Sequence, residues 1–407
     1  MQNSPINAQR SKMENQKTVG FLLKRVDCND GVASHCESLM RGLKAVGWRV
    51  VLITGSVNYD AGSEDSFQAL KDLSEDWIVF EDMKPFLSTW DNIRRIKEIV
   101  NKYEISLFHA HGYSILLLAR VLKIFTKLEC VATFHLLIED DNSTLIKSIL
   151  RPKIRKYQIY LSGFAPKAFI ASSSEIERFL LQDLGFQKNK VRKILMATDT
   201  KYFRPPSPEE RQRVREKFGF EEKDLVCSLV GRLNWIKGHD VLIDAVRQMR
   251  KTVPEITVKC LFAGSGDREK QIKEYAFASE DDSDCFLFAG HMKDLREVYW
   301  TSDILVLPSR SEGFGVVVAE AMCCGIVPIR TPGAGSMDQI LEGKTGYVVP
   351  FDDPEALSKA IQKLANQDLR LQMGQRCAEY ASSVFDLELM VKKTVELYCE
   401  CSGMETK

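Results

Sequence analysis

The sequence lacks both a long apolar run and an excess of charge of one sign. Its 407 residues carry 56 Lys and Arg against 56 Asp and Glu, which gives a formal net charge of zero. Such a balance excludes proteins that bind nucleic acid through bulk positive charge, although it leaves room for a local basic patch. The longest apolar candidate, residues 116–125, is interrupted by Arg120 and Lys123, which favours a buried helix over a membrane span.

A secretion signal and a metal-binding pattern are also lacking. Residues 1–17 are polar and have no apolar core segment, so we expect a disordered tail and not a signal peptide. The eleven cysteines include no Cys-x-x-Cys pair, and the six histidines do not complete a zinc-binding spacing. We therefore predict no bound metal and reduced, structural thiols, as in a soluble cytoplasmic protein.

Short apolar runs alternate with helical patterns along the whole chain. After the run at residues 19–23, apolar residues recur at intervals of three and four from Val32 to Val46, and Gly47 ends the pattern. The same rhythm restarts with the run at residues 225–230. Alternation of this kind predicts an α/β protein with two doubly wound parallel sheets, which bind ligands at the carboxyl ends of their strands.

The densest proline cluster, residues 203–208, separates the two halves and is followed by a charged run at 209–217. Proline stiffens a connection and disfavours the continuation of either sheet, so this segment is the predicted linker. We place the first domain at 18–203 and the second at 204–385, with a cleft between them.

Two glycine-containing turns follow apolar runs in the second half. Residues 230–238 carry Arg232 and Lys237, a fork and a point charge that suit a diphosphate, although both could be solvated surface cations. Residues 263–267 contain Gly264 and Gly266 but lack the third glycine of a dinucleotide fingerprint. There the backbone at Gly266 could approach a base or a phosphate, or the segment is only a tight turn.

Residues 307–322 give the strongest signal of a ligand site. Glu312 and Glu320 lie eight residues apart across a predicted strand-to-helix turn. Gly313 and Gly315 let the backbone turn closely, so that amides at the start of the helix point at an anion. Backbone donors for phosphate beside two carboxylates for hydroxyls fit a sugar nucleotide; the alternative is a helix N-terminal acid with an exposed glutamate.

These two motifs together resemble those of the retaining glycosyltransferases of family 4, and the resemblance extends over residues 19–397. It implies the B-type glycosyltransferase fold, with two Rossmann-like domains and the active site between them. The first domain would bind the acceptor and the second the nucleotide sugar, and a C-terminal helix at 386–407 would cross back to the first domain. The turns at 333–338 and 343–348 also match the family pattern.

The resemblance extends to the N-terminal half through looser motifs. Residues 30–35 take the place of the family's double-glycine loop, where Gly31 would approach the diphosphate or the acceptor. His135, at the end of a predicted strand, corresponds to the histidine that contacts the transferred sugar. For His109 and His111 a structural and a functional role remain equally open, and Asp199 matches the family pattern only weakly.

The resemblance implies transfer of a hexosyl group with retention, from a nucleotide sugar to a hydroxyl acceptor, without a metal or other cofactor. UDP is the usual nucleotide and GDP the alternative, and the product would be a glycolipid, polysaccharide or glycoconjugate. A nucleotide-sugar epimerase, a sugar phosphorylase and a non-catalytic sugar-nucleotide-binding regulator are the competing interpretations. The implied catalytic residues are His135, Arg232, Lys237 and Glu312, and the implied donor-binding residues are Gly31, Gly266, Gly313, Phe314, Gly315 and Glu320.

Residues 142–174 contain no acidic residue and mix basic with aliphatic side chains. Such a stretch could dock on an anionic membrane at its inner face, or it could form an ordinary helix pair. We expect no nucleic-acid partner.

Overall fold

The computed structural model describes residues 17–27, 31–58, 64–80, 90–135, 159, 165–279 and 284–405. The chain forms two compact units. The N-terminal unit comprises Met1–Ser172, Ile176–Leu195 and Leu387–Lys407, and the C-terminal unit comprises Ser173–Glu175 and Met196–Asp386. The boundary therefore lies at residue 195 and not at 203, because the backbone N–H of Thr198 donates to the carbonyl of Phe385 within the C-terminal unit (2.9 Å).

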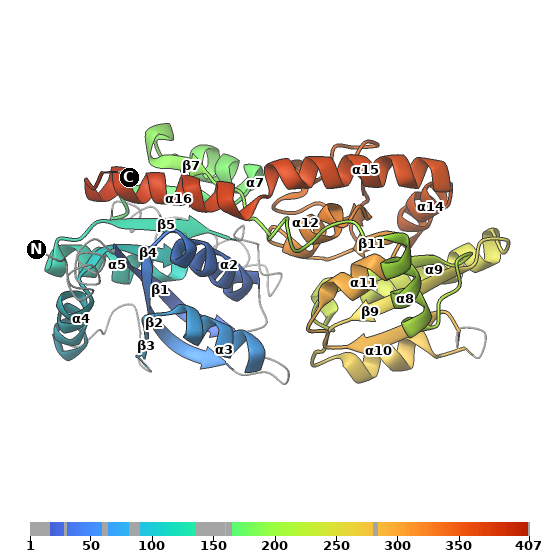
Figure 1. Ribbon diagram of the computed structural model, residues 1–407, viewed down its shortest axis with the longest axis horizontal. Helices are drawn as coiled ribbons and strands as arrows, with labels where there is room; N and C mark the ends of the chain where they lie inside the picture. The colour runs from blue at the N-terminus through green and yellow to red at the C-terminus, as the bar shows by residue number, and fades with distance from the viewer. Residues whose placement is uncertain are drawn as a thin grey trace, which may run out of the picture. The chain divides into compact units, whose positions relative to one another are not determined.

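The N-terminal unit contains one parallel sheet in the order β3-β2-β1-β4-β5-β6-β7. Figure 1 shows the succession β3-β2-β1-β4-β5. Its strands are β1 (Thr18–Asp27), β2 (Arg49–Asn58), β3 (Asp76–Val79), β4 (Ile105–His111), β5 (Cys130–Phe134), β6 (Ala168–Ala171) and β7 (Val191–Lys193). Its helices are α2 (Gly31–Ala45), α3 (Glu64–Leu73), α4 (Trp90–Tyr103), α5 (Leu116–Thr126), α7 (Ser174–Arg178, which begins in the C-terminal unit) and α16 (Leu387–Ser402). This unit also contains three short helical segments, η1 (Tyr113–Ile115), η2 (Phe179–Asp183) and η3 (Lys188–Lys190).

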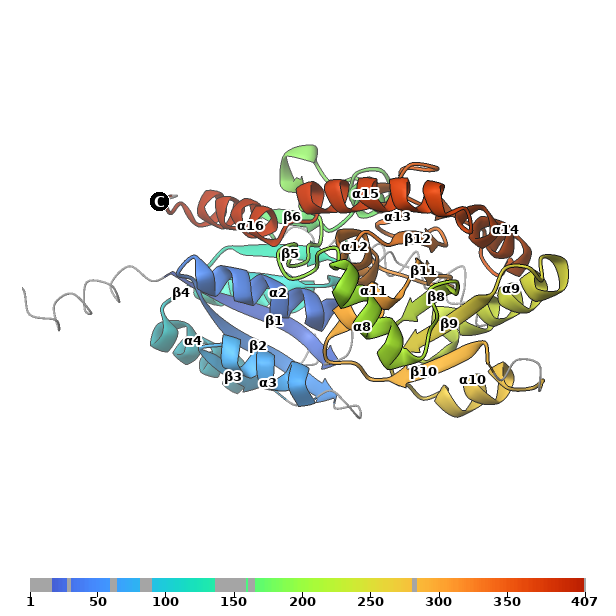
Figure 2. The same ribbon diagram turned by 45° about the vertical axis from the view of Figure 1, so that its right-hand side comes forward.

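Helix α2 covers β1 and β2 through residues spaced three and four apart, and α16 packs beside it and reaches β4 and β5 (Figure 2). The two helices approach closely at Gly42, where a β-carbon would lie 2.2 Å from Cγ2 of Val391. The glycine therefore permits this helix contact. The N-terminal unit is thus completed by a helix that follows the whole C-terminal unit in sequence.

The C-terminal unit contains a second parallel sheet, in the order β10-β9-β8-β11-β12-β13. Its strands are β8 (Leu225–Val230), β9 (Val258–Ala263), β10 (Phe286–Gly290), β11 (Ile304–Leu307), β12 (Val327–Arg330) and β13 (Tyr347–Val348). Its helices are α8 (Pro208–Phe218), η4 (Trp235–Lys237), α9 (His239–Thr252), α10 (Glu269–Ala276), α11 (Leu295–Thr301), α12 (Val316–Cys323), α13 (Ser336–Gln339), α14 (Pro354–Leu364) and α15 (Gln367–Val384). This is the strand order of a Rossmann fold, and its topological switch point lies between β8 and β11.

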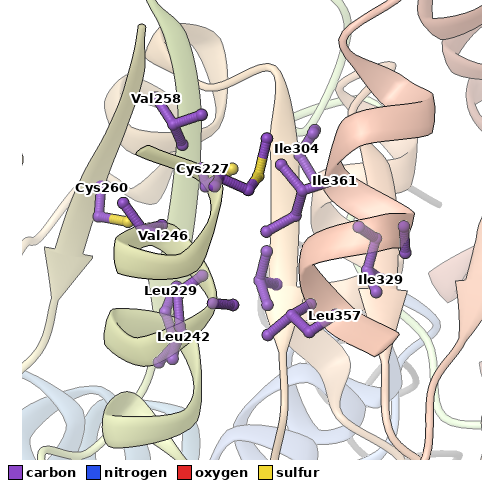
Figure 3. Packing of buried hydrophobic residues seen from close by; sticks show 14 of the residues in the cluster. Cys227, Leu229, Leu242, Val246, Val258, Cys260, Ile304, Ile329, Leu357 and Ile361 are labelled. Atoms are coloured by element: carbon purple, nitrogen blue, oxygen red, sulfur yellow. The ribbon is translucent and has the colours of Figure 1, made fainter. Parts of the chain in front are cut away.

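The core of the C-terminal unit lies between this sheet and helices α9 and α14, which pack side by side. Leu242 and Val246 of α9 and Leu357 and Ile361 of α14 point at the strands (Figure 3). Their spacing of four residues places each pair on one helix face, as an amphipathic helix requires. The two sheets confirm the predicted α/β fold with two Rossmann-like domains.

Two predictions concern cysteines and membrane spans. The ten cysteines in the described part of the chain are free and buried. Among the described residues, no helix is both long and apolar enough to cross a membrane.

Candidate functional site

An ion pair joins the turns that follow β8 and β11 at the switch point of the C-terminal sheet. Lys237 Nζ lies 2.6 Å from Glu312 Oε2, and the two side chains are 22% and 12% exposed. The hydroxyl of Ser309 donates to the same carboxylate oxygen at 3.1 Å. The structure thus brings together two of the predicted catalytic residues at the sheet edge where doubly wound folds bind ligands.

The ion pair keeps Glu312 charged. Burial acts to raise the pKa of this carboxyl, but the charge and hydrogen bond of Lys237, with the charge of Arg330 and the hydroxyl of Ser309, outweigh it. The pKa of Glu312 is therefore below its usual value. At neutral pH the side chain is a carboxylate that can accept hydrogen bonds from hydroxyl groups.

The backbone of the turn that carries Lys237 packs closely against the backbone of the turn after β11. Gly238 has φ of +69°, and a β-carbon there would lie 2.2 Å from the carbonyl oxygen of Pro308. At Gly266 a β-carbon would lie 2.3 Å from the carbonyl oxygen of Leu233. Glycine at 266 therefore has a packing reason of its own, in addition to the donor contact predicted for it.

Arg310 holds the same two turns together, and no sequence pattern singles it out. Its guanidinium donates to the Trp235 carbonyl at 2.7 Å and to both carboxylate oxygens of Asp240 at 3.0 and 2.6 Å. Its backbone N–H donates to the Ile236 carbonyl at 2.7 Å. The guanidinium also stacks on the Trp235 ring, 3.5 Å from its centroid. Arg310 therefore fixes the position of the turn that ends at Lys237.

A second buried arginine holds the turn after β11. Arg330, only 1% exposed, donates to the Phe314 carbonyl at 3.1 Å, and Gln339 Nε2 donates to the same oxygen at 2.9 Å. The ring of Phe314 is 2% exposed and packs edge-on against Phe385. With its ring buried, Phe314 would contact a donor through its backbone, and its role as a donor-binding residue stays a prediction.

Helix α12 begins beside this turn. Gly315 caps it with φ of +70°, a left-handed conformation that favours glycine. The first N–H groups of a helix have no intrahelical acceptor, so those of Val316 and Val317 are suited to an anion. Gly313 and Gly315 thus lie where the predicted phosphate-binding amides require them.

Glu320 lies within α12, eight residues after Glu312 in sequence, and has a different environment. It accepts a hydrogen bond from the buried Tyr299 hydroxyl at 2.7 Å. Burial raises the pKa of Glu320 to about 7, and the Tyr299 hydrogen bond opposes this only in part. Arg232 is partly buried, and its guanidinium has no hydrogen-bond or ion-pair partner within the described ranges. It is thus available to a ligand.

Four histidines gather in the N-terminal unit. Both ring nitrogens of His109 are occupied, by the Tyr398 hydroxyl at 2.5 Å and the Thr133 hydroxyl at 2.6 Å, which supports a structural role. His111 Nδ1 lies 3.2 Å from His135 Nε2, and His35 of α2 stacks edge-on with His135. Burial lowers the pKa of His135 well below its usual value, so its imidazole is neutral.

Other predicted residues have clear structural surroundings. Gly31 begins α2, and a β-carbon there would meet nothing within 4 Å, whereas Asp30 lies outside the described residues. Asp199 accepts hydrogen bonds from the backbone of Lys201 and Tyr202, both at 3.0 Å, and so caps a turn. Of the basic segment 142–174, the structure describes residues 159 and 165–174, and Lys167 donates to the Cys401 carbonyl at 2.8 Å.

Comparison with known proteins gives two family models that match consecutive parts of the chain. Residues 29–202 match the model "Glycosyltransferase Family 4", and residues 210–384 match "Glycosyl transferases group 1". The putative glycosyltransferase EpsD of Bacillus subtilis is 26% identical over 77% of this chain and 81% of its own length. A D-inositol 3-phosphate glycosyltransferase of Corynebacterium urealyticum is 29% identical over 53% of this chain and 52% of its own length.

Solved structures show the same fold. A glycosyltransferase from Rickettsia africae superposes with a TM-score of 0.77 at 22% identity, covering 95% of this chain and 99% of its own. HepE of Anabaena, solved with UDP, gives a TM-score of 0.78 at 16% identity, covering 94% and 100%. From the two family models, which together span both units, the chain belongs to the family 4 glycosyltransferases.

Proposed function

We propose that the protein transfers a sugar from a UDP-sugar to a hydroxyl acceptor with retention of configuration, using groups of its own chain without a metal. The observation that carries the proposal is the Lys237–Glu312 ion pair at the switch point of the C-terminal sheet. It sets a cation for phosphate beside a carboxylate for sugar hydroxyls. HepE, a structural neighbour, was solved with UDP and with UDP-glucose, which supports UDP as the nucleotide.

The donor's diphosphate would be held by three kinds of donor. Lys237 offers a point charge, Arg232 offers a fork, and the amides at the start of α12 offer aligned N–H groups. These groups stabilise the negative charge that develops on the leaving diphosphate in the transition state. In binding the donor, Lys237 would exchange its contact with Glu312 for a contact with phosphate.

The two glutamates would bind the donor's hydroxyl groups. Glu312, kept ionised by Lys237, would accept hydrogen bonds from the transferred sugar, and Glu320 from the ribose. The neutral His135 would contact the same sugar from the N-terminal unit, with Gly31 near the diphosphate or the acceptor. As the family resemblance implies, retention would follow from attack of the acceptor on the front face of the sugar, assisted by the donor's own phosphate.

In that step the bond from the anomeric carbon to the diphosphate oxygen breaks, and a bond from this carbon to the acceptor oxygen forms. The acceptor's proton moves to an oxygen of the departing diphosphate. The electron pair of the broken bond leaves with UDP. No redox change occurs.

A panel of nucleotide sugars in a thermal-shift assay tests the donor. A ligand that binds the folded state raises the unfolding temperature, and we expect UDP-sugars to do so and GDP-sugars not to. The responding donor is then incubated with candidate acceptors, UDP release is measured, and the anomeric configuration of the product is read by NMR.

Variants locate the activity in the proposed site. We expect Lys237→Ala and Arg232→Ala each to abolish UDP release, whereas Lys359→Ala, in an exposed ion pair on α14, leaves it unchanged. Full turnover in either site variant would overturn the assignment. Conversion of the donor without any acceptor would indicate an epimerase instead.

Membrane docking through residues 142–174 also remains a proposal. We expect co-sedimentation with vesicles that contain anionic lipid, and its absence would remove this part of the proposal.

A further inference from the structure

Three of the four clustered histidines share features that the proposed transfer step does not require. His35, His111 and His135 are 6%, 4% and 5% exposed, and each offers a nitrogen within 4.8 Å of the other two. Each ring also has a buried nitrogen without a hydrogen-bond partner in the described part of the chain: Nδ1 of His35, Nε2 of His111 and Nδ1 of His135. Buried polar nitrogens normally have hydrogen-bond partners, so three such rings in one cluster are unusual.

The cluster follows from the register of the N-terminal sheet. His111 is the last residue of β4 and pairs with Thr133 of β5. His135 lies two residues after Thr133, and side chains two apart along an extended chain lie on the same face. Helix α2 covers this face and adds His35 from its second turn. All three rings therefore come from well-packed elements.

One pair of these nitrogens has the spacing of two metal ligands, and all three lie within 4.8 Å of one another. In a tetrahedral zinc site with Zn–N distances of about 2.0–2.1 Å, two ligand nitrogens lie about 3.3 Å apart. His111 Nδ1 and His135 Nε2 lie 3.2 Å apart. A metal ion would replace the single proton that these two nitrogens can share, and His35 would supply the third ligand.

The chemistry of the ligands also indicates the class of ion. Three imidazoles without a carboxylate favour Zn²⁺, Co²⁺, Ni²⁺ or Cu²⁺ over Mg²⁺ and Ca²⁺, which prefer oxygen.

We propose that His35, His111 and His135 form a binding site for one divalent transition-metal ion of the Zn²⁺ class, and that its occupation inhibits glycosyl transfer. The inhibition rests on the proposed function, because His135 would be the ring that contacts the transferred sugar. When His135 binds a metal, the lone pair of its ligating nitrogen is used in the metal bond and its ring can no longer turn toward the sugar. The metal is therefore an inhibitor of this enzyme and not a cofactor.

Metal titration of the full-length protein tests the site directly. The chelator-treated protein is titrated with Co²⁺ and Zn²⁺, and binding is followed by calorimetry and by the visible d–d bands of Co²⁺. We expect one ion per chain and a spectrum without a thiolate charge-transfer band. We also expect at least tenfold weaker binding in His35→Ala and His111→Ala and unchanged binding in His291→Ala, whose side chain is exposed in the C-terminal unit.

His35→Gln serves as a second variant in case His35→Ala does not fold, and thermal unfolding establishes that each variant is folded. Absence of stoichiometric binding would overturn the proposal. So would wild-type affinity in the folded His35 and His111 variants, or a thiolate band that places the ion on cysteines.

The inhibition has its own readout. UDP release from the responding donor should fall at least tenfold at saturating Zn²⁺, while the thermal shift caused by UDP stays the same. If the metal binds at the histidines without inhibiting, the metal site stands and the role of His135 fails. If no metal binds but UDP-sugars still stabilise the protein, the metal site fails and the donor assignment stands.

Discussion

Lys237 Nζ is bonded to Glu312 Oε2 at 2.6 Å, although the two residues are 75 positions apart in sequence. They meet because β8 and β11 are neighbours in the sheet and each ends at the same edge. In the proposed donor complex, the phosphate would compete with this carboxylate for Lys237, and Glu312 would then be free to accept hydrogen bonds from sugar hydroxyls. The proposal therefore couples binding of the donor's phosphate to binding of its sugar through this one contact.

A double-mutant cycle measures the strength of this contact. For Lys237→Met, Glu312→Gln and the double variant, we expect a coupling of about 1–3 kcal/mol in the free energy of unfolding, because both side chains are largely buried. Lys359 and Glu355 form a matched control, also at 2.6 Å, with side chains 67% and 61% exposed. Their coupling should not exceed about 0.5 kcal/mol. Equal couplings in the two cycles would contradict the assignment of a special role to the buried pair.

The raised pKa of Glu320 predicts pH-dependent donor binding. With a pKa of about 7, this carboxyl is mostly protonated at pH 6 and mostly ionised at pH 8, so affinity for a UDP-sugar should rise about tenfold over that range. Calorimetry at both pH values checks this, since the donor's own phosphates do not titrate there. Glu320→Gln should bind more weakly and show a flat profile. A steep pH dependence of donor affinity in Glu320→Gln would show that a group other than Glu320 titrates.

The same shift affects stability in the free protein. A pKa that is higher in the folded state than its ordinary value of 4.5 means that the folded state binds the proton more tightly. The stability contributed by this proton is complete below pH 4.5 and is lost as the pH rises to about 7. Thermal unfolding of Glu320→Gln should therefore lack this decrease, which is at most about 3 kcal/mol.

Gly238 offers a test of the packing between the turns. Gly238→Ala places a β-carbon 2.2 Å from the Pro308 carbonyl at a left-handed residue, so the turn that carries Lys237 must move. We expect at least tenfold lower turnover and a lower unfolding temperature. Gly219→Ala is the matched control, because Gly219 has φ of +75° but open space around it. It should lose only the roughly 1 kcal/mol of backbone strain and keep its turnover.

Arg310 is a positioning residue in this scheme. Arg310→Lys keeps the charge but loses the planar fork that bonds Trp235 and Asp240 together. We expect KM for the donor to rise several-fold and kcat to fall, with only a small change in unfolding temperature. Arg376→Lys, at an exposed position on α15, should change neither constant. A change in unfolding temperature alone would indicate that Arg310 acts only on stability.

Much of the fold could be predicted because apolar runs and helical periodicity reflect burial in both sheets. Strand β3 has no clear apolar run, because its four residues, Asp76–Val79, lie at the sheet edge and none of them is buried. The predicted domain boundary at residue 203 differs from the one at residue 195 because Thr198 forms a hydrogen bond with Phe385. No local sequence pattern predicts this contact, since the two residues are far apart in sequence.

Part of the candidate site could also be predicted from the sequence. Lys237 and Glu312 stand out because each is a charged residue that follows an apolar run and lies next to a glycine. Arg330 could not be predicted, because its function depends on which carbonyl faces it after folding. The histidine site was also missed, since its ligands are spread over a hundred residues and only the strand register unites them.

Helix α16 has a consequence for how the protein is made. It packs on α2 and on strands that the ribosome releases some 250 residues earlier, so the N-terminal unit cannot complete its packing during most of translation. The C-terminal unit ends at Asp386, so the segments that compose it leave the ribosome before α16 does. Until α16 emerges, the face of α2 at Gly42 lacks the helix that packs on it, so we expect nascent N-terminal chains to expose apolar surface and to be prone to aggregation.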